Sequence, residues 1–253
     1  MGLWSQISSC FAKDSFAACS CDERGQAIDE WARQILEALE EAGKAGYIVG
    51  GCVRDLAMGK VPHDWDITTS ARPEEMLSIA ALHGWKAIDG GGRRFGTVIV
   101  VLGGENYEVT TFRSESYGSD AHRPSEVSFA GTLKEDLMRR DFTVNAMAMD
   151  RSGRLYDAFD GLSDIAGKRL RTVGDAGERF SEDALRLFRA CRFAAQLDFM
   201  ADSSLGEGME SAFPRVSGLS LERVRQEMDR LLVSTHAASG MDLLVRSGLA
   251  RCS

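Results

Sequence analysis

Hydrophobic residues recur at helical spacing in the first predicted element, which covers residues 26–42. The apolar positions, three or four residues apart, are Ile28, Trp31, Ile35 and Leu39. Gly43 ends the pattern, as glycine commonly does after the last turn of a helix. One face of this amphipathic helix is therefore expected to pack against the protein interior.

Two more helices are predicted from the residues of their first turns. Pro73 stands where proline is favoured, and residues 74–82 continue that helix. Thr132 and Glu135 have the spacing of a capping box, which predicts a second helix after Thr132. The charged residues expected on it are Glu135, Asp136, Arg139, Arg140 and Asp141. Residues 142–149 are expected to follow as a buried helix or strand.

Short runs of apolar and β-branched residues predict the strands of a sheet. The expected strands are residues 47–49, a segment that bears Asp64 and Asp66, and residues 86–88, 97–102 and 107–112. Residues 103–106 are expected to join the last two as a hairpin, and residues 113–127 to form a long polar loop. Helices mixed with such strands predict an α+β domain with a small mixed or antiparallel sheet.

The last third of the chain shows only helical patterns. Ser181 is expected to cap a helix whose buried face is formed by residues at steps of three and four. These residues are Ala184, Leu187, Phe188, Cys191 and Ala195. We therefore predict a loose leader over residues 1–25, an α+β domain over 26–160 and an all-α domain over 161–253.

Composition narrows the class of protein. The chain is 44% hydrophobic and 27% charged, as in ordinary globular proteins, and its net charge is −8. Such an acidic balance means that any RNA contact must come from a local basic patch. No apolar run reaches the roughly 20 residues that cross a membrane. The six scattered cysteines fit no standard zinc spacing and are expected to be free thiols in a cytoplasmic protein.

The candidate chemistry begins with the segment 47–70. Asp64 and Asp66 would point to one face of a strand, where two carboxylates repel unless a cation lies between them. Carboxylate oxygens are hard ligands, which favour Mg²⁺ or Mn²⁺ as the bound ion. Gly50 and Gly51 would let backbone amides approach a phosphate. The alternative is a pair of solvated aspartates and an ordinary turn.

Glu108 faces away from Tyr107 and Val109 in its strand, and it is a candidate third carboxylate if that face is shared with Asp64 and Asp66. The alternative is an exposed strand glutamate. In the helix predicted after Ser181, the face opposite the apolar residues carries a polar stripe, formed by Asp183, Arg186, Arg189 and Arg192. By helix geometry alone this stripe would be a solvated basic face.

Four strings resemble one family. GGCVRD, HDWDITT, RRDFTVNA and EDALRLFRACRF, together with their order, resemble the class II branch of the polymerase-beta nucleotidyltransferase superfamily, which holds tRNA CCA-adding enzymes and bacterial poly(A) polymerases. The resemblance covers about residues 26–250. It implies a polymerase-beta-type head followed by a helical neck, with the family's body and tail domains absent.

The resemblance also implies roles for the candidate residues. Asp64 and Asp66, joined by Glu108, would hold two Mg²⁺ ions. The triphosphate would contact Gly50, Gly51, Arg54 and Arg140, and Asp141 would shape the site near Asn145. Asp183 and Arg186 would select the base, because cytosine and adenine both offer an amino donor beside a ring-nitrogen acceptor. Arg189 and Arg192 would hold phosphates or brace that pair.

The implied function is template-independent addition of C and A, from CTP and ATP, to the 3′ end of tRNA, with release of pyrophosphate. Poly(A) tailing, or addition of C or A alone, stays open within the family. From another class, a truncated nucleotide-binding module without catalysis also stays open. The expected partners are the tRNA 3′ end and the two nucleotides, with no membrane.

Overall fold

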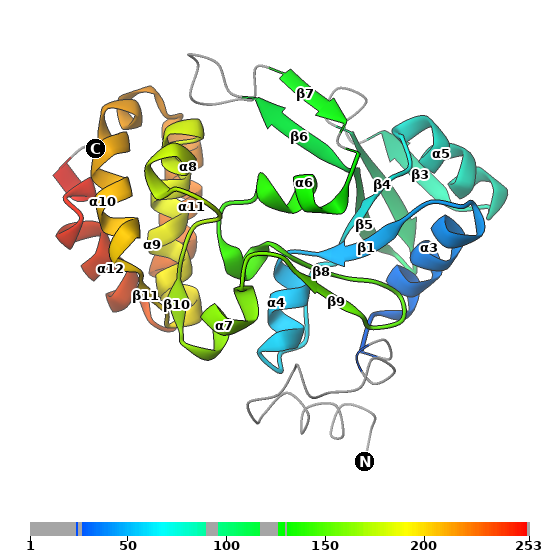
Figure 1. The fold of residues 1–253 in the computed structure, drawn as a ribbon, viewed down its shortest axis with the longest axis horizontal. Coiled ribbons are helices and arrows are strands. Elements are labelled where there is room, and N and C mark those ends of the chain that lie inside the picture. Colours follow the sequence, from blue (N-terminus) through cyan, green and yellow to red (C-terminus); the bar gives the residue numbers. More distant parts are fainter. Residues whose placement is uncertain (1–23, 25–26, 90–95, 117–125, 130, 252–253) are drawn as a thin grey trace. The chain divides into compact units, whose positions relative to one another are not determined.

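In the computed structural model, the first part of the chain forms a seven-stranded sheet together with its helices (Figure 1). Its strand order is β3-β4-β5-β2-β1-β8-β9, and the pair β2–β5 is parallel while the other neighbours are antiparallel. The predicted mixed sheet is therefore confirmed. The strands are β1 (Gly46–Val49), β2 (Asp66–Thr69), β3 (Lys86–Asp89), β4 (Thr97–Leu102), β5 (Glu105–Thr111), β8 (Met147–Met149) and β9 (Leu155–Asp157).

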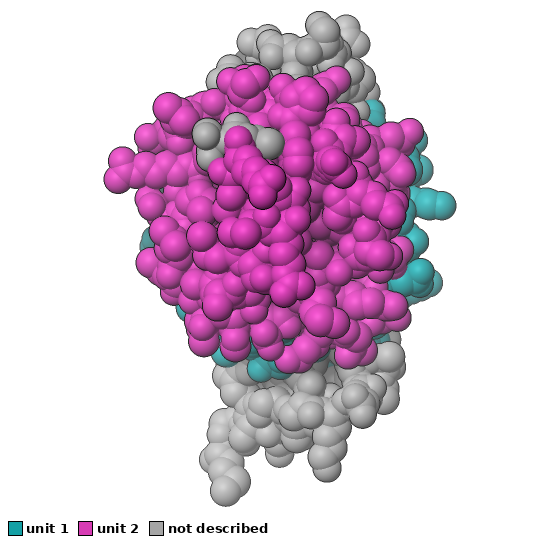
Figure 2. Space-filling view, turned by 90° about the vertical axis from the view of Figure 1, so that its left-hand side faces the viewer, with its two compact units in different colours: residues 1–114, 127–139, 145–162 teal, residues 115–126, 140–144, 163–253 magenta. Residues whose placement is uncertain are grey.

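The structure describes residues 24, 27–89, 96–116, 126–129 and 131–251. The predicted leader therefore lies, apart from Arg24, outside the described residues. The chain divides into two compact units, coloured separately in Figure 2. Unit 1 comprises residues 1–114, 127–139 and 145–162, and unit 2 comprises residues 115–126, 140–144 and 163–253. The domain boundary between residues 160 and 161 stays a prediction.

Four helices of unit 1 accompany the sheet: α3 (Glu30–Glu41), α4 (Gly51–Ala57), α5 (Pro73–Leu82) and α6 (Leu133–Met138). Helix α3 contacts β1, and α5 contacts β3 and β4. Helix α6 covers another part of the sheet, where Leu137 packs against Val49 and Ala148. Side chains alternate along a strand, so Tyr47 shares the face of Val49, and Tyr47 pairs with Thr68 of β2. Thr68 and its neighbours two residues away along β2 therefore lie on the face that α6 covers.

Unit 2 is mostly helical and is arranged around one buried helix, α9, against which α11 and α12 pack. Its helices are α8 (Ala176–Glu182), α9 (Leu185–Leu197), α10 (Ser203–Ala212), α11 (Leu221–Leu232) and α12 (Ala237–Arg246), with short 3₁₀ turns at Phe213–Gly218 and Leu249–Arg251. Helix α7 (Gly161–Ala166) crosses from the residues of unit 1 to those of unit 2. Two short strands, β10 (Arg169–Leu170) and β11 (Met200–Ala201), pair in parallel, so unit 2 is not purely helical as predicted. No helix in the described part of the chain is long and apolar enough to span a membrane.

Several predicted elements appear with small shifts in their ends. Helix α3 begins at Glu30 because Asp29 caps it, and the capping box of Thr132 and Glu135 is present at α6. The hairpin between β4 and β5 turns on Gly103 and Gly104 alone, whose φ angles are 62° and 89°. Two adjacent positive φ angles suit a tight hairpin turn, and β5 therefore starts earlier than expected.

Other predictions are wrong. Helix α6 ends at Met138, so Arg140 and Asp141 lie beyond it. A 3₁₀ turn, Thr143–Asn145, and strand β8 follow instead of one continuous element. The long loop contains two strands, β6 (Arg113–Ser116) and β7 (Glu126–Phe129), which pair with each other, and the residues between them lie outside the described part. Ser181 lies inside α8 and caps nothing there, since α9 starts after Ala184.

Phe142 offers a direct test of the interior of unit 2. Its side chain is fully buried, and its ring meets that of Phe193 edge-on with centroids 5.5 Å apart. Phe142→Ala should lower the free energy of unfolding by about 3–5 kcal/mol, because it leaves a cavity. Leu221→Ala, at a side chain that is 85% exposed, should change it by no more than about 0.5 kcal/mol. Urea unfolding measures both changes in the free energy of unfolding. Equal effects of the two substitutions would contradict the placement of Phe142 in the interior of unit 2.

Candidate functional site

The acidic end of β2 lies at the surface. Strand β2 begins at Asp66, so Asp64 precedes the strand instead of lying within it as predicted. Both aspartates are exposed, while Trp65 between them is half-buried. The parallel register places Glu108 of β5 directly beside Asp66. Paired residues of neighbouring strands face the same side, so Asp66 and Glu108 share one face of the sheet.

In the part of the chain that the structure describes, no third metal ligand is gathered at this end of the sheet. Among the residues that the structure describes, no three His, Cys, Asp or Glu side chains are grouped so that they could hold a metal ion. The metal-binding role of Asp64 and Asp66 stays a prediction. Glu108 as a third ligand stays a prediction.

The glycine turn lies next to Asp66. Gly50 has φ 84° and ψ −129°, a conformation open only to glycine, and its N–H donates to the Met147 carbonyl at 3.1 Å. Helix α4 starts at Gly51, and the buried Cys52 thiol lies 3.4 Å from the Val49 carbonyl and 4.0 Å from the Asp66 carbonyl. Burial, with a smaller contribution from the Asp66 charge, raises the pKa of Cys52 to about 12, so the thiol keeps its proton. The first turn of α4 therefore lies next to the start of β2.

Arg54 completes this group in unit 1. Its Nε and Nη2 donate to Asp55 Oδ1 at 2.9 and 2.7 Å, and its Nη1 donates to Asn145 Oδ1 at 2.7 Å. A Cβ added to Gly51 would lie 3.6 Å from Arg54 Nη2, so the guanidinium borders the glycine turn. Unit 1 thus brings together the predicted residues Gly50, Gly51, Arg54 and Asp66, and the Asn145 of the RRDFTVNA string.

Unit 2 holds the remaining predicted residues, beginning with Arg140 and Asp141. Arg140 is half-buried and Asp141 is buried. Asp141 Oδ1 accepts from the Phe142 N–H at 2.8 Å, and its Oδ2 accepts from Arg189 Nε at 2.8 Å and Nη2 at 2.5 Å. Burial alone would raise the pKa of Asp141, but the charge and hydrogen bonds of Arg189, helped by Arg186, hold it at about 2. Asp141 is therefore a charged anchor for Arg189.

The arginine stripe of α9 is not the solvated face that helix geometry alone predicts. Arg192 is 7% exposed, and its Nε and Nη1 donate to Glu227 Oε2 at 2.5 Å and Gln196 Oε1 at 2.7 Å. The guanidinium also lies 4.0 Å from the centre of the Phe193 ring. Burial lowers the pKa of Arg192 and Glu227 opposes this, so the arginine stays charged in a carboxylate-lined interior. These contacts support bracing as its role.

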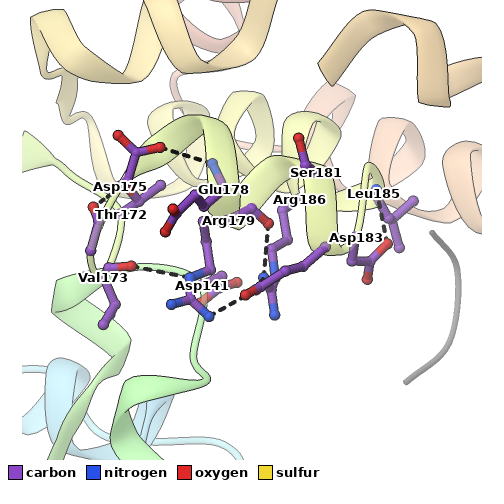
Figure 3. A network of polar contacts seen from close by, with 12 residues as sticks. Asp141, Thr172, Val173, Asp175, Glu178, Arg179, Ser181, Asp183, Leu185 and Arg186 are labelled. Atoms are coloured by element: carbon purple, nitrogen blue, oxygen red, sulfur yellow. Dashed lines mark hydrogen bonds and ion pairs between the residues drawn. The ribbon is translucent and has the colours of Figure 1, made fainter. Parts of the chain in front are cut away.

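The two predicted base-reading residues are held by different neighbours (Figure 3). Arg186 is 6% exposed, and its Nη1 donates to the Arg179 carbonyl at 2.8 Å and to Glu182 Oε2 at 2.6 Å. Asp183 lies between α8 and α9, where its Oδ1 accepts from the Leu185 N–H at 3.0 Å. Its Oδ2 lies 3.5 Å from Arg223 Nη2. The junction of the two helices therefore fixes both side chains.

Several residues of this network, among them Arg179, Glu182 and Glu227, were not predicted from the sequence. Glu182 Oε2 accepts from Arg179 Nη1 at 2.8 Å, in addition to its bond from Arg186 Nη1. Glu227 is 6% exposed and pairs with Arg192. A sequence signal existed for Glu227, since it stands three residues after Val224 and four before Leu231, at an apolar position of α11. Glu182 is the first residue of the EDALRLFRACRF string and stands three residues after Arg179 and four before Arg186, a spacing at which helical charges pair.

Comparison with family models identifies two matching regions. The model described as the poly(A) polymerase head domain matches residues 46–171. A second model, described as the probable RNA and SrmB-binding site of polymerase A, matches residues 199–252. The two regions cover most of the chain from β1 to its last helical turn.

Individual relatives agree with these models. The chain is 44% identical over 220 residues to a CCA-adding enzyme of Leuconostoc citreum, covering 87% of this chain and 53% of the relative. A crystal structure of the Bacillus stearothermophilus CCA-adding enzyme with CTP is similar at TM-score 0.78 and 42% identity, covering 86% of this chain and 52% of that one. A tRNA nucleotidyltransferase with a primer tRNA and an ATP analogue matches at TM-score 0.70 and 30% identity, over 85% and 60% of the two chains. The chain spans about half the length of the curated relatives it matches.

The Asp141–Arg189 pair predicts how stability depends on pH. The folded-state pKa of Asp141 is lowered to about 2, so the pair contributes stability above the ordinary carboxyl pKa and loses it as the pH falls towards 2. The stability difference between the wild type and Asp141→Asn should therefore shrink by about 2 kcal/mol between pH 5 and pH 2. Urea unfolding at several pH values measures it. A difference that does not change with pH would contradict the ionised pair.

Proposed function

Since this chain belongs to the family of the poly(A) polymerase head domain, we propose that it forms the head and neck of a CCA-adding enzyme. In this proposal it adds C and A from CTP and ATP to the 3′ end of tRNA, without a template, and releases pyrophosphate. The relatives named CCA-adding enzymes are 43–47% identical to it over matching stretches of 211–223 residues, which favours CCA addition over poly(A) tailing.

The observation that carries the proposal is the neighbourhood of Asp66. Asp66 is exposed and is the first residue of β2, and the strand register places Glu108 beside it. The Cys52 thiol, in the first turn of α4, lies close to the Asp66 carbonyl. Mg²⁺ is commonly held by one or two carboxylates together with substrate phosphates. The two exposed aspartates therefore fit this ion, or Mn²⁺, without a third protein ligand. When bound, a divalent ion would supply positive charge to the reacting phosphate group.

The chain's own residues would bind the triphosphate. Gly50 and Gly51 would let the backbone approach a phosphate without a Cβ in the way, and Gly51 would supply the N–H because that of Gly50 donates to the Met147 carbonyl. Arg54 is held by Asp55 and Asn145, so its guanidinium needs little reordering when a phosphate arrives. Arg140 would add a second positive charge. In phosphoryl transfer, a protein contributes mainly by positioning the reacting groups and by stabilising their charge, and not by covalent chemistry.

Asp183 and Arg186 would select the base. A carboxylate accepts from the amino group of cytosine or adenine, and a guanidinium donates to the ring nitrogen beside it. Uracil and guanine present the reverse pattern and would leave both side chains unpaired, which such a site rejects strongly. Glu182 supports this role because its contact with Arg186 keeps that side chain in one orientation. Arg189 and Arg192 would brace the pair from the same helix.

The proposal includes a cytoplasmic location, where tRNA and nucleoside triphosphates meet. Cys52 and Cys191 are free thiols, as is usual in a reducing compartment.

The activity can be tested with each of the four triphosphates and a tRNA that lacks its CCA end. The wild type should incorporate C and A but not U or G. Asp64→Ala and Asp66→Ala should lower incorporation by more than about 100-fold, beyond the loss typical of outer-shell partners of a metal. The control Glu74→Gln, at an exposed position in the first turn of α5, should retain activity. Incorporation by the aspartate variants at the wild-type rate would rule out the site.

The base-selecting role predicts a change of specificity. Asp183→Asn and Arg186→Ala should lower the preference for CTP and ATP over UTP and GTP by about 100-fold or more, because the hydrogen-bond match is lost. Arg225→Ala on α11 is the control, since its side chain is 77% exposed. The measurement is kcat/KM for each triphosphate. Unchanged ratios with lower overall rates would contradict selection by these two residues.

A further inference from the structure

The function proposed above assigns no role to a buried carboxylate that is bonded to β2. Asp136 of α6 is fully buried. A buried charge is costly unless it is paired and hydrogen-bonded. Its Oδ1 accepts from Arg139 Nε at 3.0 Å, with Arg139 Nη2 also at 3.0 Å, and from the Arg113 N–H at 3.3 Å. Its Oδ2 accepts from the Thr68 hydroxyl at 3.1 Å.

The partners of Asp136 come from separate segments of unit 1. Thr68 belongs to β2, Arg113 is the first residue of β6, and Arg139 follows α6. One carboxylate thus joins the strand that starts with Asp66, the beginning of the β6–β7 pair and the end of a helix. Because both oxygens are used, a shift of any one segment would cost hydrogen bonds to a buried charge.

Thr68 connects this junction to the candidate site. It stands two residues after Asp66 in β2, so the two side chains lie on the same face of the sheet. The register pairs Asp66 with Glu108 and Thr68 with Thr110, and the Thr68 hydroxyl also lies 3.3 Å from the Thr110 carbonyl. The hydrogen bond from Thr68 to Asp136 is therefore made two residues along β2 from Asp66, the predicted metal ligand.

We propose that Asp136 is a positioning residue for nucleotide transfer. It holds β2 through Thr68 and β6 through the Arg113 backbone, and so sets where the Asp66 carboxylate stands relative to the β5 strand and the glycine turn. Asp136 itself touches neither nucleotide nor metal. The inference rests on the proposed function, because it assigns Asp136 a role at that site.

The test compares Asp136→Asn and Thr68→Val with the wild type in the full chain. Two quantities are measured: the Mg²⁺ concentration that gives half-maximal CTP incorporation, and the affinity for Mn²⁺ alone by electron paramagnetic resonance. Asp136→Asn should weaken both by about 10- to 100-fold, as is typical for partners of metal ligands. Thr68→Val removes one hydrogen bond and should weaken both by about 2- to 10-fold.

Asp164 supplies a matched control. It is also fully buried, accepts from the Thr143 hydroxyl at 2.6 Å and from Arg171 Nε at 3.0 Å, and belongs to unit 2. Asp164→Asn should lower the Tm about as much as Asp136→Asn does, but leave the Mn²⁺ affinity unchanged. This control separates loss of stability from loss of position.

The outcomes separate the two proposals. If Asp136→Asn and Thr68→Val lower the Tm but keep the wild-type Mg²⁺ requirement and Mn²⁺ affinity, Asp136 is purely structural and the inference is overturned. If Asp136→Asn does not fold, Thr68→Val decides by the same readouts. If the wild type incorporates no nucleotide, the proposed function fails, while the Mn²⁺ affinities of the variants still support or overturn the positioning role.

Discussion

The parallel pairing of β2 with β5 is the constraint on which the candidate site depends. It places Asp66 beside Glu108 and Thr68 beside Thr110, so the polar side chains of two strands lie on one face of the sheet. Because side chains alternate, a slip of one residue would send all of them to the opposite face. Two contacts cross between the strands in this register: the Thr68 hydroxyl lies 3.3 Å from the Thr110 carbonyl, and the β-branched partners Ile67 and Val109 are both buried.

Unit 2 follows a different principle, in which arginines of α9 are fixed by buried carboxylates from distant parts of the sequence. Arg189 is paired with Asp141, 48 residues away, and Arg192 with Glu227, 35 residues away. Removing one member of such a pair leaves an uncompensated buried charge, which is far more costly than losing a surface pair. The side chains at the α8–α9 junction are therefore held in a single arrangement before any ligand arrives. Rigid donors and acceptors of this kind suit selection by hydrogen-bond pattern.

Local patterns in the sequence predicted much of unit 1 and less of unit 2. The alternation of Tyr107, Val109 and Thr111 and the capping box at Thr132 are complete within a few residues, so β5 and α6 could be identified. The break between α8 and α9 has no glycine or proline to mark it. It depends on Asp183, which accepts from the Leu185 N–H, and so a single helix capped by Ser181 was expected. The burial of the arginine stripe was missed for a similar reason, because its carboxylate partners are remote in sequence and helical periodicity does not record them.

The central claim is that Asp64 and Asp66 form one ligand set at the start of β2, next to the glycine turn. The most direct measurement is a crystal structure of the chain with Mn²⁺ and a non-hydrolysable CTP analogue, with anomalous scattering recorded at the manganese edge. The account predicts an anomalous peak at about 2.0–2.3 Å from oxygens of both aspartates, with the triphosphate against Gly50 and Gly51. Manganese bound elsewhere, or a nucleotide bound away from these glycines, would contradict it.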